Sequence, residues 1–321
     1  MGGSPCVSVL IPAYGVARYI AETLASVFAQ EFSGPFEVIV VNDGSPDTAD
    51  FERVIAPFRD RIVYLVQPNR GPSGARNTAF RMSSAPLIAL IDGDDVYLPE
   101  YLRVQTELLA AHPEVDLVYG DMEVFGGSSR DGLRLSALNH ETEPPSLESL
   151  IRGTATVINT PMIRREAIVA AGCWDESSRH AEDFDLWLRI AASGGGKLLR
   201  HSHLVARYRL RAGSLSSNER SMSEGRIHAF GRLLENPALP AALAPVVERR
   251  REEAWGDIAF VSAREAFRER NASLAAAYLD EALRYRPSAK LWLVARLLTL
   301  CPWVLYAAFA LRKRLSARYR D

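Results

Sequence analysis

The sequence LIALIDGDDVYLP at residues 87–99 decides the fold class of this chain. Its five apolar residues, 87–91, are too few for a long helix and are typical of a strand that is buried on both faces. Asp92, Asp94 and Asp95 follow at once, and carboxylates this close repel one another unless a cation lies among them. Such oxygen ligands suit Mn²⁺ or Mg²⁺, and Gly93 leaves room for a ligand to approach the backbone. A solvated acidic turn is the alternative.

The elements around this stretch predict an α/β fold. Strands are expected at residues 7–11, 36–41, 62–66 and 87–91, and helices at residues 19–30, 48–58 and 75–82. Their alternation predicts a mostly parallel sheet with helices on both faces. Asp43 follows the second strand, the turn-rich segment 67–74 follows the third, and the acidic cluster follows the fourth. Because ligands bind beyond the carboxyl ends of such strands, this coincidence favours the metal site over the solvated turn.

The rest of the chain divides near residue 217. Helices are predicted at residues 100–111 and 181–192, strands at 115–119, 155–163, 197–199 and 204–208, and a polar loop at 126–145. We expect this loop, and the segment 207–217 with its alternating arginines, to face an acceptor. From about residue 218 the pattern is helical, and residues 241–268 and 272–286 predict an antiparallel pair. The predicted organisation is an α/β domain at 1–217 and a C-terminal helical region at 218–321.

Composition argues against several classes of protein. The 321 residues carry 38 basic and 39 acidic side chains, so no net charge favours nucleic acid as a partner. Cys6, Cys173 and Cys301 are widely spaced, which indicates free thiols in a reducing compartment, the cytoplasm. Residues 7–11 run into Pro12 and read as a strand, so we expect no signal peptide. Neither GxGxxG after the first strand, nor GxxxxGK[ST], nor GxSxG occurs, which disfavours dinucleotide, P-loop and serine hydrolase chemistry.

The side chains at the strand ends indicate a metal-bound diphosphate. Asp94 is expected to ligate the metal, with Asp92 beside it, nearer the ribose or orienting the site. Asp43 could accept hydrogen bonds from a nucleotide base. Arg76 and the backbone of residues 71–74 could offer positive partners to the donor. For Arg76, a solvated arginine on a helix is the alternative.

Glu182 and Asp183 form a second acidic pair at the start of a predicted helix. Capping or interaction with the helix dipole would explain carboxylates at this position. The functional alternative is a general base that deprotonates an acceptor hydroxyl, which needs a carboxylate with a tuned pKa. Trp187 lies one turn later on the same face, where it could line an acceptor site or belong to the core.

Six segments together resemble family 2 glycosyltransferases. They are VSVLIPAY (7–14), VIVVNDGSPD (38–47), QPNRGPSGARN (67–77), IDGDD (91–95), GCWDE (172–176) and EDFDLWLR (182–189), in that family's order over roughly residues 5–215. The resemblance implies the GT-A fold, a nucleotide-binding α/β/α sandwich. It also implies transfer of a sugar from a nucleotide-sugar with inversion at the anomeric carbon, assisted by Mn²⁺ or Mg²⁺. The QxxRW motif of processive members is absent after residue 183, so transfer of a single sugar is expected.

The resemblance also implies residue roles. Asp43 matches the aspartate that contacts the base, Asp92 and Asp94 match the metal-binding DXD pair, and Asp183 matches the catalytic base. The expected donor-binding residues are Pro12, Ala13, Tyr14, Asp43, Asn69, Gly71, Arg76, Asp92 and Gly93. The expected acceptor residues are Trp174, Glu182 and Trp187. Trp174 stands where many relatives have phenylalanine, which we interpret as a packing variation.

The predicted function is therefore transfer of a sugar, with UDP-sugars favoured, to a hydroxyl of a glycan or lipid-linked glycan in the synthesis of a cell-surface polysaccharide. A nucleotidyltransferase is one alternative, but it would carry a Gly-rich basic loop after the first strand, where residues 12–14 read Pro-Ala-Tyr. A non-catalytic nucleotide-sugar-binding module is the other alternative. The presence of both Asp94 and Asp183 favours the enzyme.

Residues 291–311 have the length of a membrane span, but Arg296 and Pro302 interrupt them. An arginine at the centre of a span costs about 2.5–3.5 kcal/mol. We therefore expect two shorter helices that meet near Pro302, with peripheral contact through residues 291–320 at the cytoplasmic face of the inner membrane. The basic residues between 312 and 320 would bind anionic headgroups. A packed helix, including one in a homodimer interface, and a true span are the alternatives.

Overall fold

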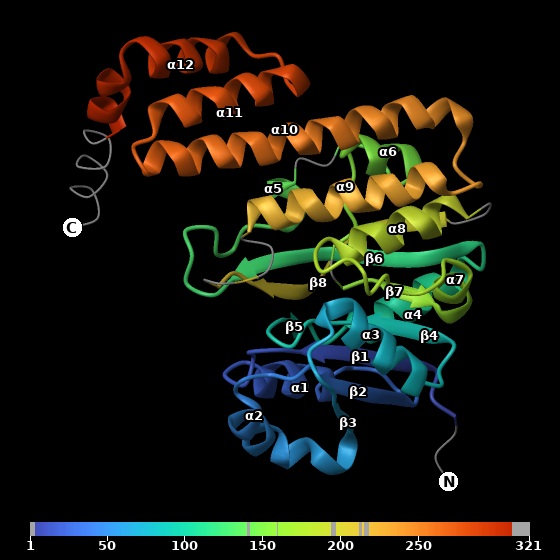
Figure 1. Cartoon of the computed structure of the whole chain (residues 1–321). Helices are drawn as coiled ribbons and strands as arrows, with labels where there is room; N and C mark the ends of the chain where they lie inside the picture. Colours follow the sequence, from blue (N-terminus) through green and yellow to red (C-terminus); the bar gives the residue numbers. More distant parts are fainter. Residues whose placement is uncertain are drawn as a thin grey trace.

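The computed structural model describes residues 4–139, 142–158, 160–193, 197–211, 214 and 218–309. Eight strands form one sheet in the order β3-β2-β1-β4-β7-β6-β8-β5 (Figure 1). The strands are β1 (Val7–Ala13), β2 (Phe36–Asn42), β3 (Val63–Val66), β4 (Leu87–Leu90), β5 (Val96–Tyr97), β6 (Val115–Phe125), β7 (Met162–Arg164) and β8 (Lys197–Arg209). The first four are parallel neighbours, and β6 pairs parallel with β8, whereas β7 and β5 run antiparallel to their neighbours. The predicted α/β fold with a mostly parallel sheet is confirmed.

Helices connect these strands. They are α1 (Ile20–Phe28), α2 (Thr48–Ile55), the 3₁₀ helix η1 (Ala56–Arg61), α3 (Gly71–Met82), α4 (Tyr101–Ala111), α5 (Leu135–Leu138), α6 (Leu147–Arg152), α7 (Arg165–Ala170) and α8 (Glu182–Ala192). Ile20, Leu24 and Val27 recur about once per turn in α1 and are fully buried. Such an apolar stripe is what fastens a helix to a sheet. The sheet and these helices share one hydrophobic core.

The first strand is longer than the sequence predicted, because β1 runs through Pro12 to Ala13. Leu10 accepts a backbone hydrogen bond from Ile91 at 3.3 Å, so alternate residues of β1 face β4. The β4 partners of β1 end at Leu90, before the level of Pro12. The missing N–H of Pro12 therefore faces the region beyond the end of β4, where the ladder needs no donor.

The strands after residue 115 also differ from prediction. β6 continues through Gly120 to Phe125, and β8 is one strand where two short ones were expected. A Cβ on Gly120 would lie 2.5 Å from His201 Cε1 and 2.7 Å from the His203 carbonyl oxygen. The glycine thus lets β8 approach closely where the register between the two strands shifts. Of the predicted strand 155–163, only residues from 162 onward are in β7, and residue 159 lies outside the described residues.

Helix α3 begins four residues earlier than predicted, at Gly71. The turn formers of residues 71–74 make up its first turn, where Pro72 is well tolerated because its missing N–H has no helical partner. The second half of the turn-rich segment 67–74 is therefore a helix N-terminus.

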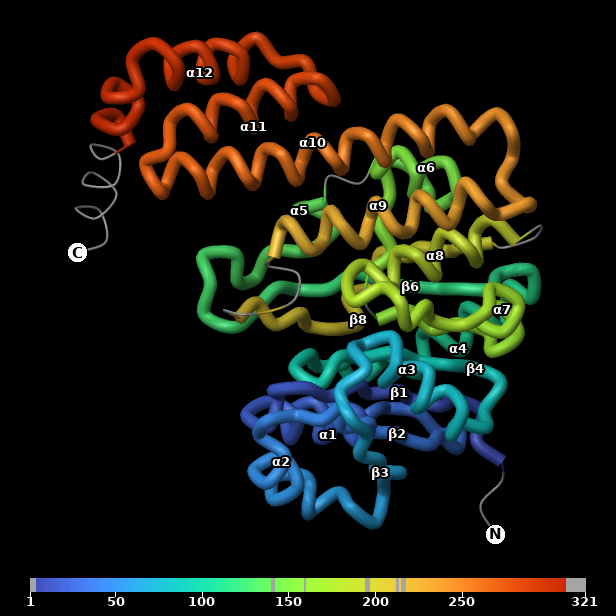
Figure 2. Tube along the Cα trace, viewed as in Figure 1, coloured from blue at the N-terminus to red at the C-terminus, as the bar shows by residue number. Residues whose placement is uncertain are grey.

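Beyond β8 lie the helices α9 (Glu219–Glu235), α10 (Ala244–Arg268), α11 (Ala272–Tyr285) and α12 (Ala289–Leu300). Figure 2 shows α9 lying along α8 and the chain then turning back through α10, α11 and α12. The main core continues into them through Phe230, Leu233 and Val247, and a smaller second core lies among α10, α11 and α12. The predicted helical extension and its antiparallel pair are confirmed, while the domain boundary at 217 stays a prediction.

In the part of the chain that the structure describes, no single helix is long and apolar enough to cross a bilayer. α12 and the helix Pro302–Phe309 meet that criterion only as a pair, bent by 112°. Two helices that meet near Pro302 were predicted, and this is confirmed. Arg296 forms an ion pair with Asp280 of α11. The basic residues between 312 and 320 lie outside the described residues.

Candidate active site

Asp43 joins three segments at the carboxyl edge of the sheet. Its backbone N–H donates to the Ala13 carbonyl at 2.9 Å, and its Oδ1 accepts from Gln67 Nε2 at 2.6 Å and from the Arg70 N–H at 2.9 Å. Gly44, with φ +67°, allows this approach, because a Cβ there would lie 2.8 Å from the Asn69 nitrogen. The Asp43 side chain is buried, and its hydrogen bonds together with that of its N–H join the ends of β1 and β2 to the segment after β3.

The loop after β1 is held against the loop after β2. The Gly15 N–H donates to Ser45 Oγ at 2.7 Å, and the Ala17 N–H donates to Asp47 Oδ2 at 2.9 Å. Tyr14, between β1 and these contacts, is 53% exposed although it is aromatic. An exposed ring at the carboxyl edge is suited to stacking on a nucleotide base. The predicted donor contacts of Pro12, Ala13 and Tyr14 stay predictions.

Each of the three aspartates after β4 has a different partner. Asp92 Oδ1 accepts from Arg76 Nη2 at 2.8 Å, and Asp94 Oδ2 pairs with Arg211 Nε. Asp95 is buried, accepts the Arg209 N–H at 2.8 Å, and through its carbonyl accepts from Thr23 Oγ1 at 2.7 Å. Asp95 is therefore structural.

Burial and the neighbouring Asp92 raise the pKa of Asp94, although Arg211 opposes this. The site thus disfavours a negative charge on Asp94 beside the one on Asp92, and a bound cation would relieve this repulsion. Within the described residues, no group of three or more His, Cys, Asp or Glu side chains converges on one point. The oxygen donors of Asp92 and Asp94 nevertheless fit a Mn²⁺ or Mg²⁺ ion that takes its remaining ligands from phosphate and water.

Gly93 has a different role from the one expected from the sequence. A Cβ there would lie 3.0 Å from Val16 Cγ2 and 3.3 Å from the Pro12 carbonyl oxygen. The missing side chain thus allows the acidic segment to pack against the end of β1. Gly93 therefore provides space for the neighbouring chain and not for a ligand. Contact of Gly93 with the donor stays a prediction.

Arg76 links the two acidic clusters of the sequence. It lies in α3 and is 5% exposed; it pairs with Asp92 through Nη2 and with Glu182 through Nη1. Burial alone would lower its pKa, but the charges of Asp92, Glu182 and Asp183 raise it above the ordinary value. The alternative of a solvated arginine is wrong. This guanidinium holds together carboxylates that are ninety residues apart in the chain.

Asp183 stands in the first turn of α8. Its Oδ1 accepts the Phe184 N–H at 2.7 Å, so it satisfies one free donor of the helix terminus. A carboxylate that served only the helix dipole would have a lowered pKa. Instead, burial and then the neighbouring Glu182 raise the pKa of Asp183 to about 6, while Arg76 opposes the rise. A carboxylate with this pKa can act as a general base near neutral pH.

Of the three expected acceptor residues, Glu182 is buried against Arg76. Trp174 and Trp187 are each 2% exposed and belong to the hydrophobic core. The backbone of Trp174 is held by the Asn77 side chain, which donates to its carbonyl at 2.8 Å and accepts its N–H at 3.1 Å. Packing in the hydrophobic core thus explains why both positions are tryptophan. Contact of these buried rings with an acceptor stays a prediction, which their low exposure does not support.

Arg209 at the end of β8 and Arg211 just beyond it both contact Asp94, and neither contact was predicted from the sequence. Arg209 Nε donates to the Asp94 carbonyl at 2.7 Å, beside the Arg211 contact with the same residue. Both arginines line a hollow of about 540 Å³ together with Arg18, Tyr19 and residues 126–128. Alternation along a strand places residues 207, 209 and 211 on one face, but this spacing does not identify their partner.

The family model described as "Glycosyl transferase family 2" matches residues 8–168. A protein of Escherichia coli, "UDP-Glc:alpha-D-GlcNAc-diphosphoundecaprenol beta-1,3-glucosyltransferase WfgD", is 26% identical over 233 residues, which cover 72% of this chain and 87% of that protein. The chain spans 59% of the length of another relative, the uncharacterized glycosyltransferase RP339 of Rickettsia prowazekii, at 30% identity over 195 residues that cover 58% of this chain.

Two solved structures share the fold. S. aureus TarS 1-349 in complex with UDP-GlcNAc superposes with a TM-score of 0.62 at 19% identity, over 88% of this chain and 81% of that chain. The mannosyltransferase PcManGT of Pyrobaculum calidifontis, in complex with GDP-Man and Mn²⁺, superposes with a TM-score of 0.58 at 18% identity, over 95% and 84%. The α/β architecture of this chain is thus the fold of these two structures.

Proposed function

The chain belongs to glycosyl transferase family 2, and from this premise we propose that it is an inverting, non-processive glycosyltransferase. The proposed donor is a nucleotide-sugar, with UDP-sugars favoured because the Escherichia coli relative is named for UDP-Glc and the TarS structure is a complex with UDP-GlcNAc. The proposed acceptor is a hydroxyl of a glycan or lipid-linked glycan, as in the name of the Escherichia coli relative. The pathway proposed is synthesis of a cell-surface polysaccharide.

The observation that carries this proposal is the bridge through Arg76. Its guanidinium contacts Asp92 of the DXD pair and Glu182, the neighbour of Asp183. The carboxylate with the raised pKa is therefore held near the pair that would bind the diphosphate. A general base must lie near the donor carbon, because it takes the proton of the acceptor hydroxyl that attacks this carbon.

In the proposed reaction, Asp183 takes the proton of the acceptor hydroxyl while that oxygen attacks the anomeric carbon. The carbon–oxygen bond to the diphosphate breaks on the opposite side, and the nucleoside diphosphate leaves with the electron pair. A divalent cation bound by Asp94 and Asp92 would neutralise the charge of this leaving group. Arg76 holds Asp92 in place, and Arg211 adds a second positive group beside Asp94. The hollow lined by residues 126–128 and 209–211 is the proposed acceptor side.

Release of the nucleoside diphosphate tests the function and its metal requirement together. Incubated with UDP-glucose, UDP-N-acetylglucosamine or GDP-mannose and Mn²⁺, the protein is expected to release UDP or GDP. Chelation by EDTA should abolish release, and Asp94→Asn should lower it about 100-fold, because the leaving group loses its charge partner. The measurement is free nucleotide against time for each donor.

Asp50→Asn is the matched control, because Asp50 lies on the exposed face of α2 and forms its ion pair with Arg53, one turn along the same helix. This variant should release nucleotide at the wild-type rate. Release that persists in EDTA and in Asp94→Asn would remove the metal from the mechanism. A protein that binds nucleotide but releases none from any donor, with acceptor glycan present, would favour a binding module.

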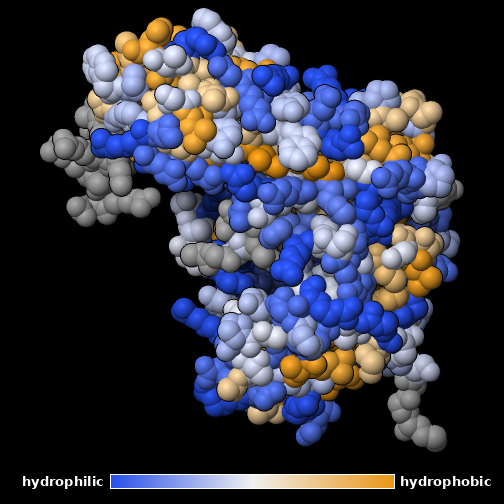
Figure 3. Space-filling model, in the orientation of Figure 1, coloured by the Kyte–Doolittle hydropathy of each residue, from blue (hydrophilic) through white to orange (hydrophobic). Residues whose placement is uncertain are grey.

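We also propose that the bent helix pair at the C-terminus rests on the cytoplasmic face of the membrane. Leu300 is 76% exposed and Trp303 is 70% exposed, although both are large and apolar. Figure 3 shows hydrophobic residues gathered at this end of the molecule. The following residues, Arg312, Lys313 and Arg314, supply positive charge for anionic headgroups. A lipid-linked acceptor would be reached from such a position.

Flotation with vesicles tests this contact. The full chain is expected to float with phosphatidylglycerol vesicles and much less with phosphatidylcholine vesicles. Trp303→Glu should lower the bound fraction about tenfold, since it places a charge in the apolar interface. Trp255→Glu, on the exposed face of α10, is the control and should float like wild type. Equal flotation of both variants would contradict membrane contact, and concentration-dependent self-association would favour the homodimer.

A further inference from the structure

We infer that α9 is a positioning element of the active site, through Gly225, His228 and Arg232. These residues hold residues 175–181 and the first turns of α8, and so fix the place of Asp183. The inference rests on the proposed role of Asp183 as the base. Helix α9 lies outside residues 8–168, the part of the chain that the family model matches.

Gly225 marks the place where α9 comes closest to this segment. A Cβ there would lie 2.2 Å from the His180 carbonyl oxygen and 3.0 Å from Ala181 Cβ. Gly231, on the same helix, is different, because the nearest atom to its Cβ would be Arg251 Nη1 at 4.0 Å. The tight contact is therefore specific to residues 180 and 181, directly before Glu182 and Asp183.

Ala181 explains why this contact matters. It has φ +53° and ψ +30°, the left-handed conformation that a residue with a side chain rarely adopts. Such a conformation persists only where the surrounding structure holds it. The turn at Ala181 directs the chain into α8, so the backbone of α9 at Gly225 supports the turn that aims Asp183.

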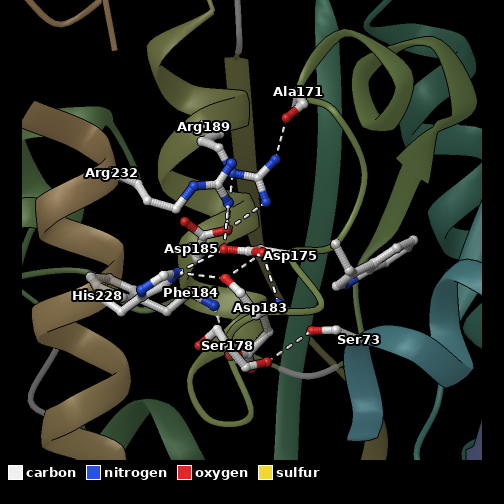
Figure 4. Close-up of polar contacts among 12 residues, drawn as sticks. Ser73, Ala171, Asp175, Ser178, Asp183, Phe184, Asp185, Arg189, His228 and Arg232 are labelled. Atoms are coloured by element: carbon white, nitrogen blue, oxygen red, sulfur yellow. Dashed lines mark hydrogen bonds and ion pairs between the residues drawn. The ribbon is translucent and has the colours of Figure 1, made fainter. Parts of the chain in front are cut away.

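A charged network reinforces the contact (Figure 4). His228 Nε2 lies 2.7 Å from Asp175 Oδ2, and Arg232 Nη1 lies 3.0 Å from the same oxygen. Arg232 Nη1 also lies 3.1 Å from Oδ2 of Asp185, which is buried in α8 two residues after Asp183. His228 and Arg232 of α9 thus form ion pairs with both the loop before Asp183 and the helix α8 that carries Asp183.

In the described part of the chain, α9 is linked to the donor side through the segment that it holds, where Glu176 pairs with Arg70 and Glu182 pairs with Arg76. Asp43 is nevertheless held by Gln67 and Arg70, and Asp92 is held by Arg76, all outside α9. A change in α9 should therefore alter the position of Asp183 more than it alters binding of the donor. This expectation distinguishes a positioning element from a helix that only stabilises the fold.

The experiment compares Gly225→Ala with Gly231→Ala in the full chain. Hydrogen exchange at residues 178–186 should become about tenfold faster in Gly225→Ala and stay at the wild-type rate in Gly231→Ala. Exchange at residues 36–45 should not change in either variant. In the nucleotide-transfer assay, Gly225→Ala should lower kcat about tenfold while KM for the donor changes less than about threefold.

Arg232 offers a second pair of variants. Arg232→Met should lower kcat at constant donor KM, and Arg232→Lys should recover part of the loss because it keeps the charge. Wild-type exchange and kcat in Gly225→Ala would overturn the inference, as would a parallel loss of kcat, donor affinity and melting temperature in both Gly225→Ala and Arg232→Met. Hydrogen exchange needs no substrate, so it tests the role of α9 independently of the reaction. Turnover in Asp183→Asn would refute the proposed function and would leave the exchange result unaffected.

Discussion

Replacing Asp183 by asparagine is expected to lower transfer about 1000-fold, within the range that loss of a general base produces. The amide has nearly the same shape, but it cannot take the proton of the acceptor hydroxyl. Binding of the nucleoside diphosphate should be almost unchanged, because that ligand is proposed to contact Asp43, Asp92 and Asp94. The measurements are kcat in the nucleotide-release assay and the affinity for UDP or GDP by calorimetry.

The pH dependence of the wild-type rate should show the same group. Because burial and Glu182 raise the pKa of Asp183 to about 6, the base is protonated and inactive below that pH. The rate should therefore rise with pH, reach half its maximum near pH 6 and level off above about pH 7. A rate that stays constant down to pH 5, or wild-type turnover in Asp183→Asn, would refute Asp183 as the base.

The stability of the fold should fall with rising pH in the range where the rate increases. A carboxyl whose folded pKa lies above its unfolded value of 3.8 stabilises the fold only while it is protonated, and this contribution is lost as the pH rises through 6. The shift corresponds to at most about 3 kcal/mol, and to less for a side chain that is only partly buried. Asp183→Asn is therefore expected to melt at or above the wild-type temperature at pH 7.5, with no such gain at pH 4.

Arg76→Met is the second large effect, and it should damage both stability and activity. The change leaves Asp92, Glu182 and Asp183 close together without their shared cation. Removing one partner from a buried ion pair costs about 3–5 kcal/mol, because the remaining charge is neither solvated nor paired. Transfer should be lost as well, since the bridge between the two carboxylate clusters is gone. Urea denaturation and the nucleotide-release assay measure the two effects.

Arg81→Met is the matched control for this prediction, because Arg81 lies on the exposed face of the same helix and donates to Thr78. It should change stability by less than about 0.5 kcal/mol. The deficit of Arg76→Met should also shrink as the pH falls below about 6, where Asp183 takes up a proton. Equal stability of the Arg76 and Arg81 variants would show that the bridge contributes nothing to the fold.

Much of the fold could be predicted from the sequence, because its signals are local. The apolar runs that became β1, β2 and β4 are buried on both faces, and β2 and β4 run into polar residues at the same edge of the sheet. The errors arose where the partner strand decides the outcome. Gly120 reads as the end of a strand, yet it lies within β6 because β8 needs its missing side chain to approach.

The candidate site was less accessible to sequence analysis. Strand-end positions were sufficient to single out Asp43, Asp92 and Asp94, and the helix start singled out Asp183. Trp174 and Trp187 illustrate the limit, because an aromatic residue near a site has the same sequence signal whether it lines a pocket or fills the core. Their 2% exposure depends on how α3, α8 and the sheet pack together.

The sequence by itself determined the alternation of the first four strands with their helices and the edge of the sheet where carboxylates gather, since both follow from patterns within a few residues of each other. Only the tertiary structure decided how these groups are paired. Arg76 meets Glu182 across 106 positions of the chain, and Arg211 meets Asp94 across 117. The contact of Gly225 with His180 likewise depends on how α9 docks on the preceding loop. Such pairs carry no local signal, because their energy arises only when packing brings the charges together and removes water from around them.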